Sequence, residues 1–191
     1  MTDIFNLEPN TTVLQDDSYI LSYPHLLSYF AAKQSFGPED VVCGAHMVYG
    51  WMPTVLELYP ESPNIDLPKA AELLTKAKTT GVLTDDEIEQ LARLVNNSLV
   101  GASKLLHFVS PERFAIWDSK IYAFVYRERP HNYRVSQVSK YRSYLTKLDQ
   151  HQKDSRFATF HNSVNTKIGY SVSALRALEL VMFLNAPVFG G

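Results

Sequence analysis

A lysine and an aspartate are the two side chains whose type and spacing in this chain could do chemistry. Lys104 stands in an apolar segment with helical periodicity, and Asp118 follows it beyond a polar turn. A lysine amine is nucleophilic only in its neutral form, which burial favours. Lys104 and Asp118 are therefore the two residues of this segment that could take part in chemistry.

Two predicted helices and the turn between them must position this pair. Four apolar residues at helical spacing predict one buried face: Ala102, Leu105, Leu106 and Val109. Lys104, His107 and Phe108 are then expected on the opposite side, where His107, Phe108 and Trp117 would line a pocket. Ser110 and Pro111 end this helix. Asp118 is a favourable N-cap for the next helix, because its carboxylate would accept hydrogen bonds from free amides of the first turn.

The rest of the chain also shows helical periodicity, and it lacks the sustained alternation of a β-strand. Residues 1–22 are expected to form an extended arm with at most a short strand or turn. Helices are expected at about 24–37, 38–50, 67–78, 85–95, 99–109, 119–127, 136–148, 156–165 and 174–185. A capping box at Thr84 to Glu87 marks one start, and Asn96-Asn97-Ser98 predicts a break, since Asn and Ser favour caps. The expected class is all-α, a compact multi-helix globular fold.

Charge is distributed unevenly along the 191 residues. Residues 1–98 carry 5 Lys/Arg and 14 Asp/Glu, whereas residues 99–191 carry 13 and 6, so the halves have net charges of −9 and +7. The sequence predicts one domain, 1–191, with an acidic lobe 1–98 packed on a basic lobe 99–191. The basic half could meet nucleic acid, or the two halves could simply attract each other and a partner's surface.

Several kinds of protein are disfavoured. The single cysteine, Cys43, cannot form an internal disulfide, and the N-terminus has no apolar run like that of a signal peptide. No apolar stretch approaches the roughly 20 residues needed to span a bilayer. The expectation is a soluble intracellular protein in the cytoplasm, with no membrane association. The six histidines have no paired ligand spacing and no glycine-rich phosphate loop is present, so neither a metal nor a cofactor is expected.

About thirty residues resemble a known family. Val100-Gly101-Ala102-Ser103-Lys104, the helical Leu105 to Phe108, and Phe114-Ala115-Ile116-Trp117-Asp118 follow one another. This order resembles the core of helix-hairpin-helix DNA glycosylases, particularly those that excise 8-oxoguanine. The resemblance implies a glycosylase-like helical fold, a DNA-gripping turn at Gly101, a Schiff base formed by Lys104, and charge stabilisation by Asp118. The family's hairpin usually has two glycines, and alignment on His107-Phe108 would move the catalytic position to Ser103.

A basic and aromatic stretch follows these residues. Its cations are Arg127, Arg129, Arg134, Lys140, Arg142 and Lys147, interleaved with tyrosines. Such a stretch can follow a phosphate backbone and stack bases, although amphipathic helices also carry such a solvent face. The sequence thus favours a DNA-damage-binding protein or glycosylase-like enzyme. The alternative is a non-enzymatic intracellular interaction protein, whose charge asymmetry serves association with a partner protein or a second copy.

Overall fold

The computed structural model describes residues 3–52, 54–60 and 64–189, and within these ranges the chain is helical with no β-strand. The elements are α1 (Ile4–Leu7), the 3-10 helix η1 (Glu8–Asn10), α2 (Ser18–Ala31), α3 (Pro38–Trp51), α4 (Leu67–Thr80), α5 (Asp85–Leu94), α6 (Leu99–Val109), α7 (Ser119–Tyr126), α8 (Asn132–Val135), α9 (Val138–Gln152), α10 (Phe157–Ile168) and α11 (Ala174–Leu184). The expected all-α class is confirmed. None of the helices in these ranges is long and apolar enough to cross a membrane.

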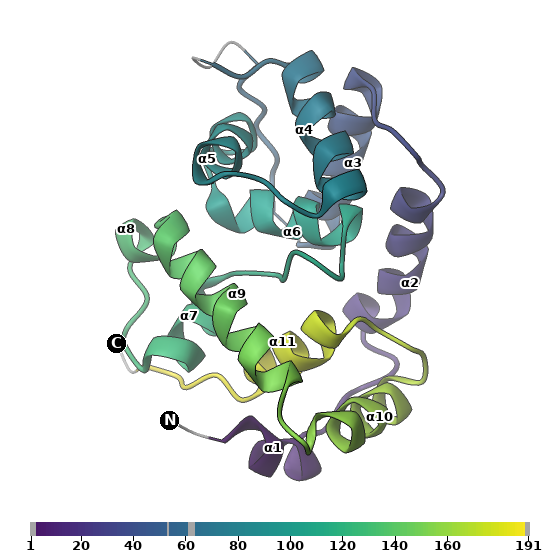
Figure 1. Cartoon of the computed structure of the whole chain (residues 1–191), viewed down its shortest axis with the longest axis vertical. Helices are drawn as coiled ribbons and strands as arrows, with labels where there is room; N and C mark the ends of the chain where they lie inside the picture. The colour runs from purple at the N-terminus through teal and green to yellow at the C-terminus, as the bar shows by residue number, and fades with distance from the viewer. Residues whose placement is uncertain (1–2, 53, 61–63, 190–191) are drawn as a thin grey trace.

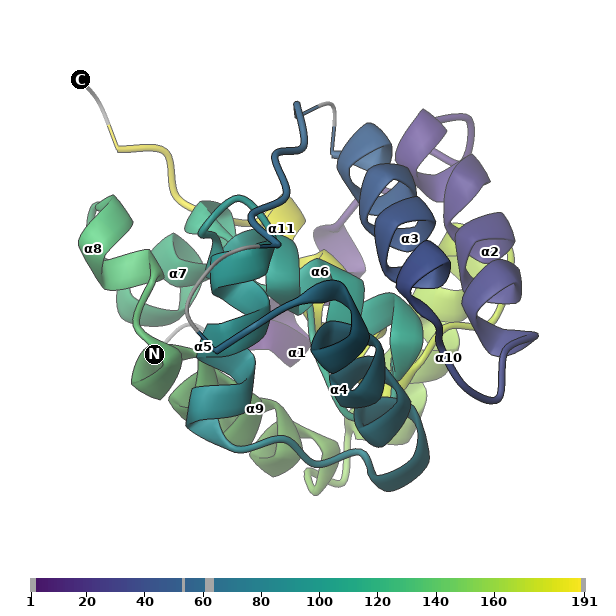
Figure 2. The ribbon, with the colours of Figure 1, turned by 90° about the horizontal axis from the view of Figure 1, so that it is seen from above.

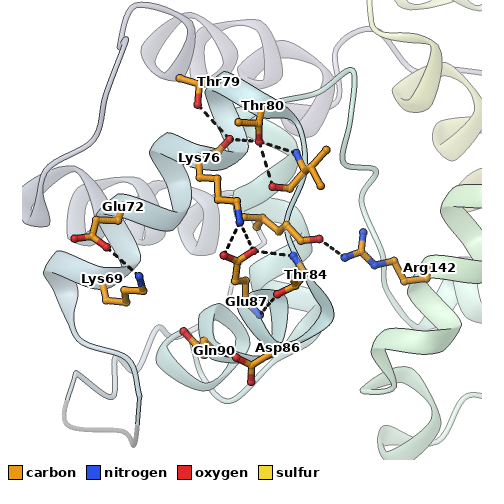
Figure 3. Close-up of polar contacts among 12 residues, drawn as sticks. Lys69, Glu72, Lys76, Thr79, Thr80, Thr84, Asp86, Glu87, Gln90 and Arg142 are labelled. Atoms are coloured by element: carbon orange, nitrogen blue, oxygen red, sulfur yellow. Dashed lines mark hydrogen bonds and ion pairs between the residues drawn. The ribbon is translucent and has the colours of Figure 1, made fainter.

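Local capping signals set several helix ends. Thr84 and Glu87 form the predicted capping box, with Glu87 accepting from the Thr84 amide at 2.7 Å, and Lys76 of α4 pairs with the same carboxylate at 2.6 Å (Figure 3). Asn96 and Asn97 adopt left-handed backbone conformations, with φ of 55° and 47°. They separate α5 from α6, so the predicted break is confirmed.

Helix α2 differs from the prediction. It begins at Ser18, capped by Asp17, and Pro24 lies inside it rather than at its opening. Proline has no amide hydrogen to donate to the carbonyl four residues earlier, here that of Ile20. The Tyr170 hydroxyl donates to this oxygen instead, at 2.7 Å. This tertiary hydrogen bond satisfies the carbonyl that Pro24 leaves free, and sequence spacing alone gave no sign of it.

The first residues also differ from the expected extended arm, because α1 and η1 occupy them and pack against C-terminal helices. The Lys167 amine of α10 pairs with the Glu8 carboxylate at 2.7 Å and donates to the Thr11 carbonyl at 3.1 Å. Residues 132–135, which lie between the helices predicted at 119–127 and 136–148, form the short helix α8. Both corrections involve short helices whose ends are fixed by contacts distant in sequence.

Helix α6 lies at the centre of the molecule (Figure 1). It packs against α2, α3, α4 and α5, whereas α11 packs against α1, α7, α9 and α10. Figures 1 and 2 both place α8 and α2 on opposite sides of the molecule. Helix α6 thus packs with helices of the N-terminal half, and α1 packs with α11 of the C-terminal half. Helices α5 and α6, on the two sides of residue 98, also pack directly on each other.

Candidate functional site

Lys104 and Asp118 lie together in the structure. The Lys104 Nζ atom is 3.9 Å from Asp118 Oδ2, and each side chain is 13% exposed. Burial lowers the pKa of the Lys104 amine, while the charges of Asp118 and Glu179 oppose that change. The neutral, nucleophilic form of Lys104 is therefore easier to reach than that of an exposed lysine.

The backbone around the pair is held by hydrogen bonds between its sequence neighbours. Asp118 caps α7, because its Oδ1 atom accepts from the Ile121 amide at 2.9 Å, and this leaves Oδ2 to face Lys104. The Ser103 hydroxyl accepts from the Trp117 amide at 3.1 Å. Ser103 is fully buried. The alternative catalytic position from the sequence is thus occupied by a residue that ties α6 to the segment preceding α7.

Two cavities meet at this pair. The larger, of about 540 Å³, lies between the segment before α2, the end of α3 and helices α6 and α11. Its apolar wall includes Trp51, Ile116 and Phe183. The smaller, of about 340 Å³, has polar groups such as Thr54, Ser119 and Asn132. Lys104 and Asp118 line both cavities, so a ligand in either one can reach the amine.

A second charged pair lines the larger cavity. Arg176 and Glu179 of α11 form a hydrogen-bonded ion pair, with side chains 6% and 2% exposed. The guanidinium carbon of Arg176 lies 4.9 Å from the centre of the Tyr23 ring and 5.7 Å from that of Trp51. This pair was not predicted from the sequence. The available signal was an Arg and a Glu three residues apart inside an otherwise apolar helix.

The three predicted pocket residues are in the core instead. His107, Phe108 and Trp117 are 0%, 1% and 0% exposed, and none of them lines either cavity. The His107 ring bonds through Nδ1 to the Phe114 carbonyl at 2.8 Å and through Nε2 to the Tyr23 hydroxyl at 2.7 Å. The prediction that His107 and Phe108 lie on an open face of α6 is wrong, because α2 and the segment before α7 cover that face.

Gly101 lies in the first turn of α6, and its amide bonds to the Ser98 hydroxyl at 3.3 Å. A Cβ atom at this position would meet the Tyr49 hydroxyl at 2.0 Å. The residue therefore permits close packing of α6 on α3. It does not form the glycine turn expected from the resemblance, since Asn96 and Asn97 make the turn between α5 and α6.

The six predicted DNA-binding cations have different environments. Arg134 pairs with Glu128 at 2.7 Å. Arg142 pairs with Asp85 at 2.8 Å and donates to the Leu83 carbonyl. Lys140 and Lys147 both lie over the Tyr126 ring, at 4.2 and 5.0 Å. Arg127 lies over the Phe124 ring, and Arg129 lines a small hollow with Lys120. The charges of Arg134 and Arg142 are therefore partly neutralised by carboxylates of the same chain.

Among the residues the structure describes, no three His, Cys, Asp or Glu side chains gather as a metal site would require. Comparisons with protein-family models, with curated protein sequences and with solved structures find no match for this chain. The two cavities that meet at Lys104 and Asp118 are therefore the basis for assigning a function.

Proposed function

We propose that this chain is a DNA glycosylase-like enzyme that acts through the Lys104 amine and the Asp118 carboxylate. The observation that carries the proposal is a mostly buried lysine, 3.9 Å from a carboxylate, at the junction of an apolar cavity and a polar one. The apolar cavity can hold an extrahelical base beside Trp51, and the polar one can hold the attached sugar. Both volumes lie within the range of small-molecule sites.

The reaction requires the neutral amine. The Nζ lone pair forms a bond to the anomeric carbon, the glycosidic bond breaks with its electrons leaving on the base, and one proton from the nitrogen passes to that base. The sugar ring then opens: the bond between C1′ and the ring oxygen breaks, that oxygen takes a proton from solvent, and the nitrogen lone pair forms the double bond of a cationic Schiff base. Asp118 would stabilise the positive charge that develops on the sugar and on the nitrogen.

Reductive trapping tests this chemistry. The protein is incubated with duplex DNA containing an 8-oxoguanine or an abasic site, with borohydride present, and a covalent complex is expected. Lys104→Gln should abolish it. Asp118→Asn should strongly reduce it without disturbing α7, because Asn is as good an N-cap as Asp.

Lys120→Gln is the matched control. Lys120 also lines the larger cavity, but its amine lies over the Phe183 ring, 4.1 Å from the ring centre. Its complex should remain. A complex that survives Lys104→Gln would assign the nucleophile to another amine. No complex with either DNA would reject the catalytic proposal.

The second candidate is a non-enzymatic interaction protein. The ion pairs of Arg134 and Arg142 favour it, because charge that is neutralised within the chain contributes little to phosphate binding. DNA affinity measured across a salt series separates the two candidates. A phosphate-binding surface weakens steeply as salt rises, whereas absence of binding at low salt would support the interaction protein.

A further inference from the structure

Four charged side chains line the larger cavity as two oppositely charged pairs. Lys104 faces Asp118, and Arg176 is hydrogen bonded to Glu179. The pairs come from α6, the cap of α7, and α11, so the tertiary fold brings them together. With all four groups ionised the cluster is neutral, and any proton gained or lost leaves a net charge in a poorly solvated place.

Glu179 is the carboxylic acid of this cluster that changes charge near neutral pH. Burial raises the pKa of Glu179 to about 7, opposed by the attraction of Arg176 and assisted by the repulsion of Asp118. Arg176 remains a cation at this pH, because a guanidinium stays protonated in proteins. The ionisations of Glu179 and Lys104 are coupled, since each charge acts on the other.

Two buried tyrosines, Tyr23 of α2 and Tyr144 of α9, feel the charge of Glu179, and burial raises the pKa of the Tyr23 hydroxyl so that it stays neutral. Tyr144 approaches from α9 with a buried hydroxyl that has no hydrogen-bond partner in the described structure, and burial raises its pKa well above its usual value, so it stays neutral. Asp17 and Lys120 line the same cavity, but both are exposed to solvent. Their charges are therefore screened more strongly than those of the buried pair.

We propose that Glu179 is a positioning residue for Lys104: its carboxylate, held by Arg176, favours the ammonium form of Lys104, and its protonation favours the neutral amine. When Glu179 takes one proton from water, the Lys104 ammonium faces Arg176 with only Asp118 as counter-charge. It then releases a proton from Nζ to water, and the lone pair remains on the nitrogen. This inference rests on the proposed role of Lys104 as a nucleophile, but its test needs no DNA.

The prediction is an unusual pH dependence. While both lysines are mostly protonated, the ratio of the neutral fraction of Lys104 to that of an exposed lysine depends only on the difference between their pKa values. As Glu179 ionises, the pKa of Lys104 rises and this ratio falls. We expect a fall in this ratio of roughly three- to tenfold between pH 6 and 8.

Reductive methylation with formaldehyde and cyanoborohydride measures the ratio, because only the neutral amine attacks formaldehyde. Peptide mass spectrometry gives initial rates for Lys104 and for Lys153, whose side chain is 72% exposed, in the same sample. In the wild-type protein the Lys104-to-Lys153 ratio should fall as pH rises from 6 to 8. In Glu179→Gln it should stay at the high value throughout, and Glu179→Asp should restore the fall.

The outcomes are separable. If the Gln substitution merely loosens the cavity, Lys104 becomes like an exposed lysine and its ratio to Lys153 approaches one at every pH. If that variant does not fold, the wild-type profile alone decides, and a flat profile between pH 6 and 8 overturns the inference. A falling profile in a protein that gives no trapped DNA complex would leave the coupling intact and reject the glycosylase proposal.

Discussion

The Ser103 hydroxyl accepts a hydrogen bond from the backbone amide of Trp117 at 3.1 Å, and these residues are the sequence neighbours of Lys104 and Asp118. The same hydroxyl donates to the Val100 carbonyl at 2.9 Å. One buried side chain thus joins α6 to the segment that ends in the cap of α7. These hydrogen bonds of Ser103 therefore help to fix the distance between Lys104 and Asp118.

Ser103→Ala should therefore weaken both stability and trapping. The buried Trp117 amide would lose its partner, which costs about 1 to 3 kcal/mol. Urea unfolding measures that loss, and single-turnover trapping on abasic DNA should slow because Asp118 is less well placed. Ser22→Ala is a suitable control, since Ser22 is an exposed hydroxyl on α2 that bonds only to its own helix. Equal trapping rates in the two variants would contradict the positioning role.

Close packing at Gly101 gives a second prediction. An added methyl group would collide with Tyr49, so Gly101→Ala should destabilise the fold by about 1 to 3 kcal/mol. Gly50→Ala is the matched control, because nothing lies within 4 Å of its added Cβ and alanine favours a helix. That variant should be neutral or slightly more stable in thermal unfolding. Similar effects at both positions would argue against the α3–α6 contact.

Two buried leucines test the placement of the central helices. Leu106 and Leu178 are both fully buried, and replacing either with Ala should cost about 2 to 5 kcal/mol. Leu184→Ala, at a position 44% exposed, should cost much less. Denaturant unfolding of the three variants measures this. Small losses at both buried sites would show that α6 and α11 are misplaced.

The sequence predicted helix ends best where the signal is local. The Thr84 capping box, the Asn96-Asn97 break and the Asp118 cap were all predicted, since each depends on residues within one turn. The start of α2 was not, because the tertiary hydrogen bond from Tyr170 allows Pro24 inside the helix. Propensity alone cannot anticipate such a contact.

The candidate site was predictable in part. Lys104 and Asp118 were proposed as a pair from the resemblance to the glycosylase family, and the structure brings their side chains together. Arg176 and Glu179 were missed because a buried ion pair looks, in sequence, like two surface charges on an apolar helix. His107 was assigned to a pocket because helical phase shows which residues share a face but not which elements cover that face.

His107 gives the last prediction, a pH dependence of stability. Burial, together with the charge of Arg176, lowers the pKa of His107 to about 3, against an ordinary value of 6.5. The unfolded chain therefore binds more protons than the folded one between these values. The contribution of His107 to the free energy of unfolding is fully present above pH 6.5 and is lost as pH falls toward 3.

Between pH 7 and pH 5 this histidine should remove about 2 kcal/mol from the free energy of unfolding. Glu179 acts in the opposite sense, because its raised pKa makes the fold more stable as pH falls from 7. Comparison with His107→Gln cancels that effect, since Glu179 is present in both proteins. Gln can replace the bonds to Phe114 and Tyr23 but cannot take up a proton.

Urea unfolding at the two pH values should show a loss in the wild-type protein that exceeds the loss in the variant by about 2 kcal/mol. Equal losses would mean that His107 titrates in the fold as it does in the unfolded chain, as a solvent-exposed histidine would.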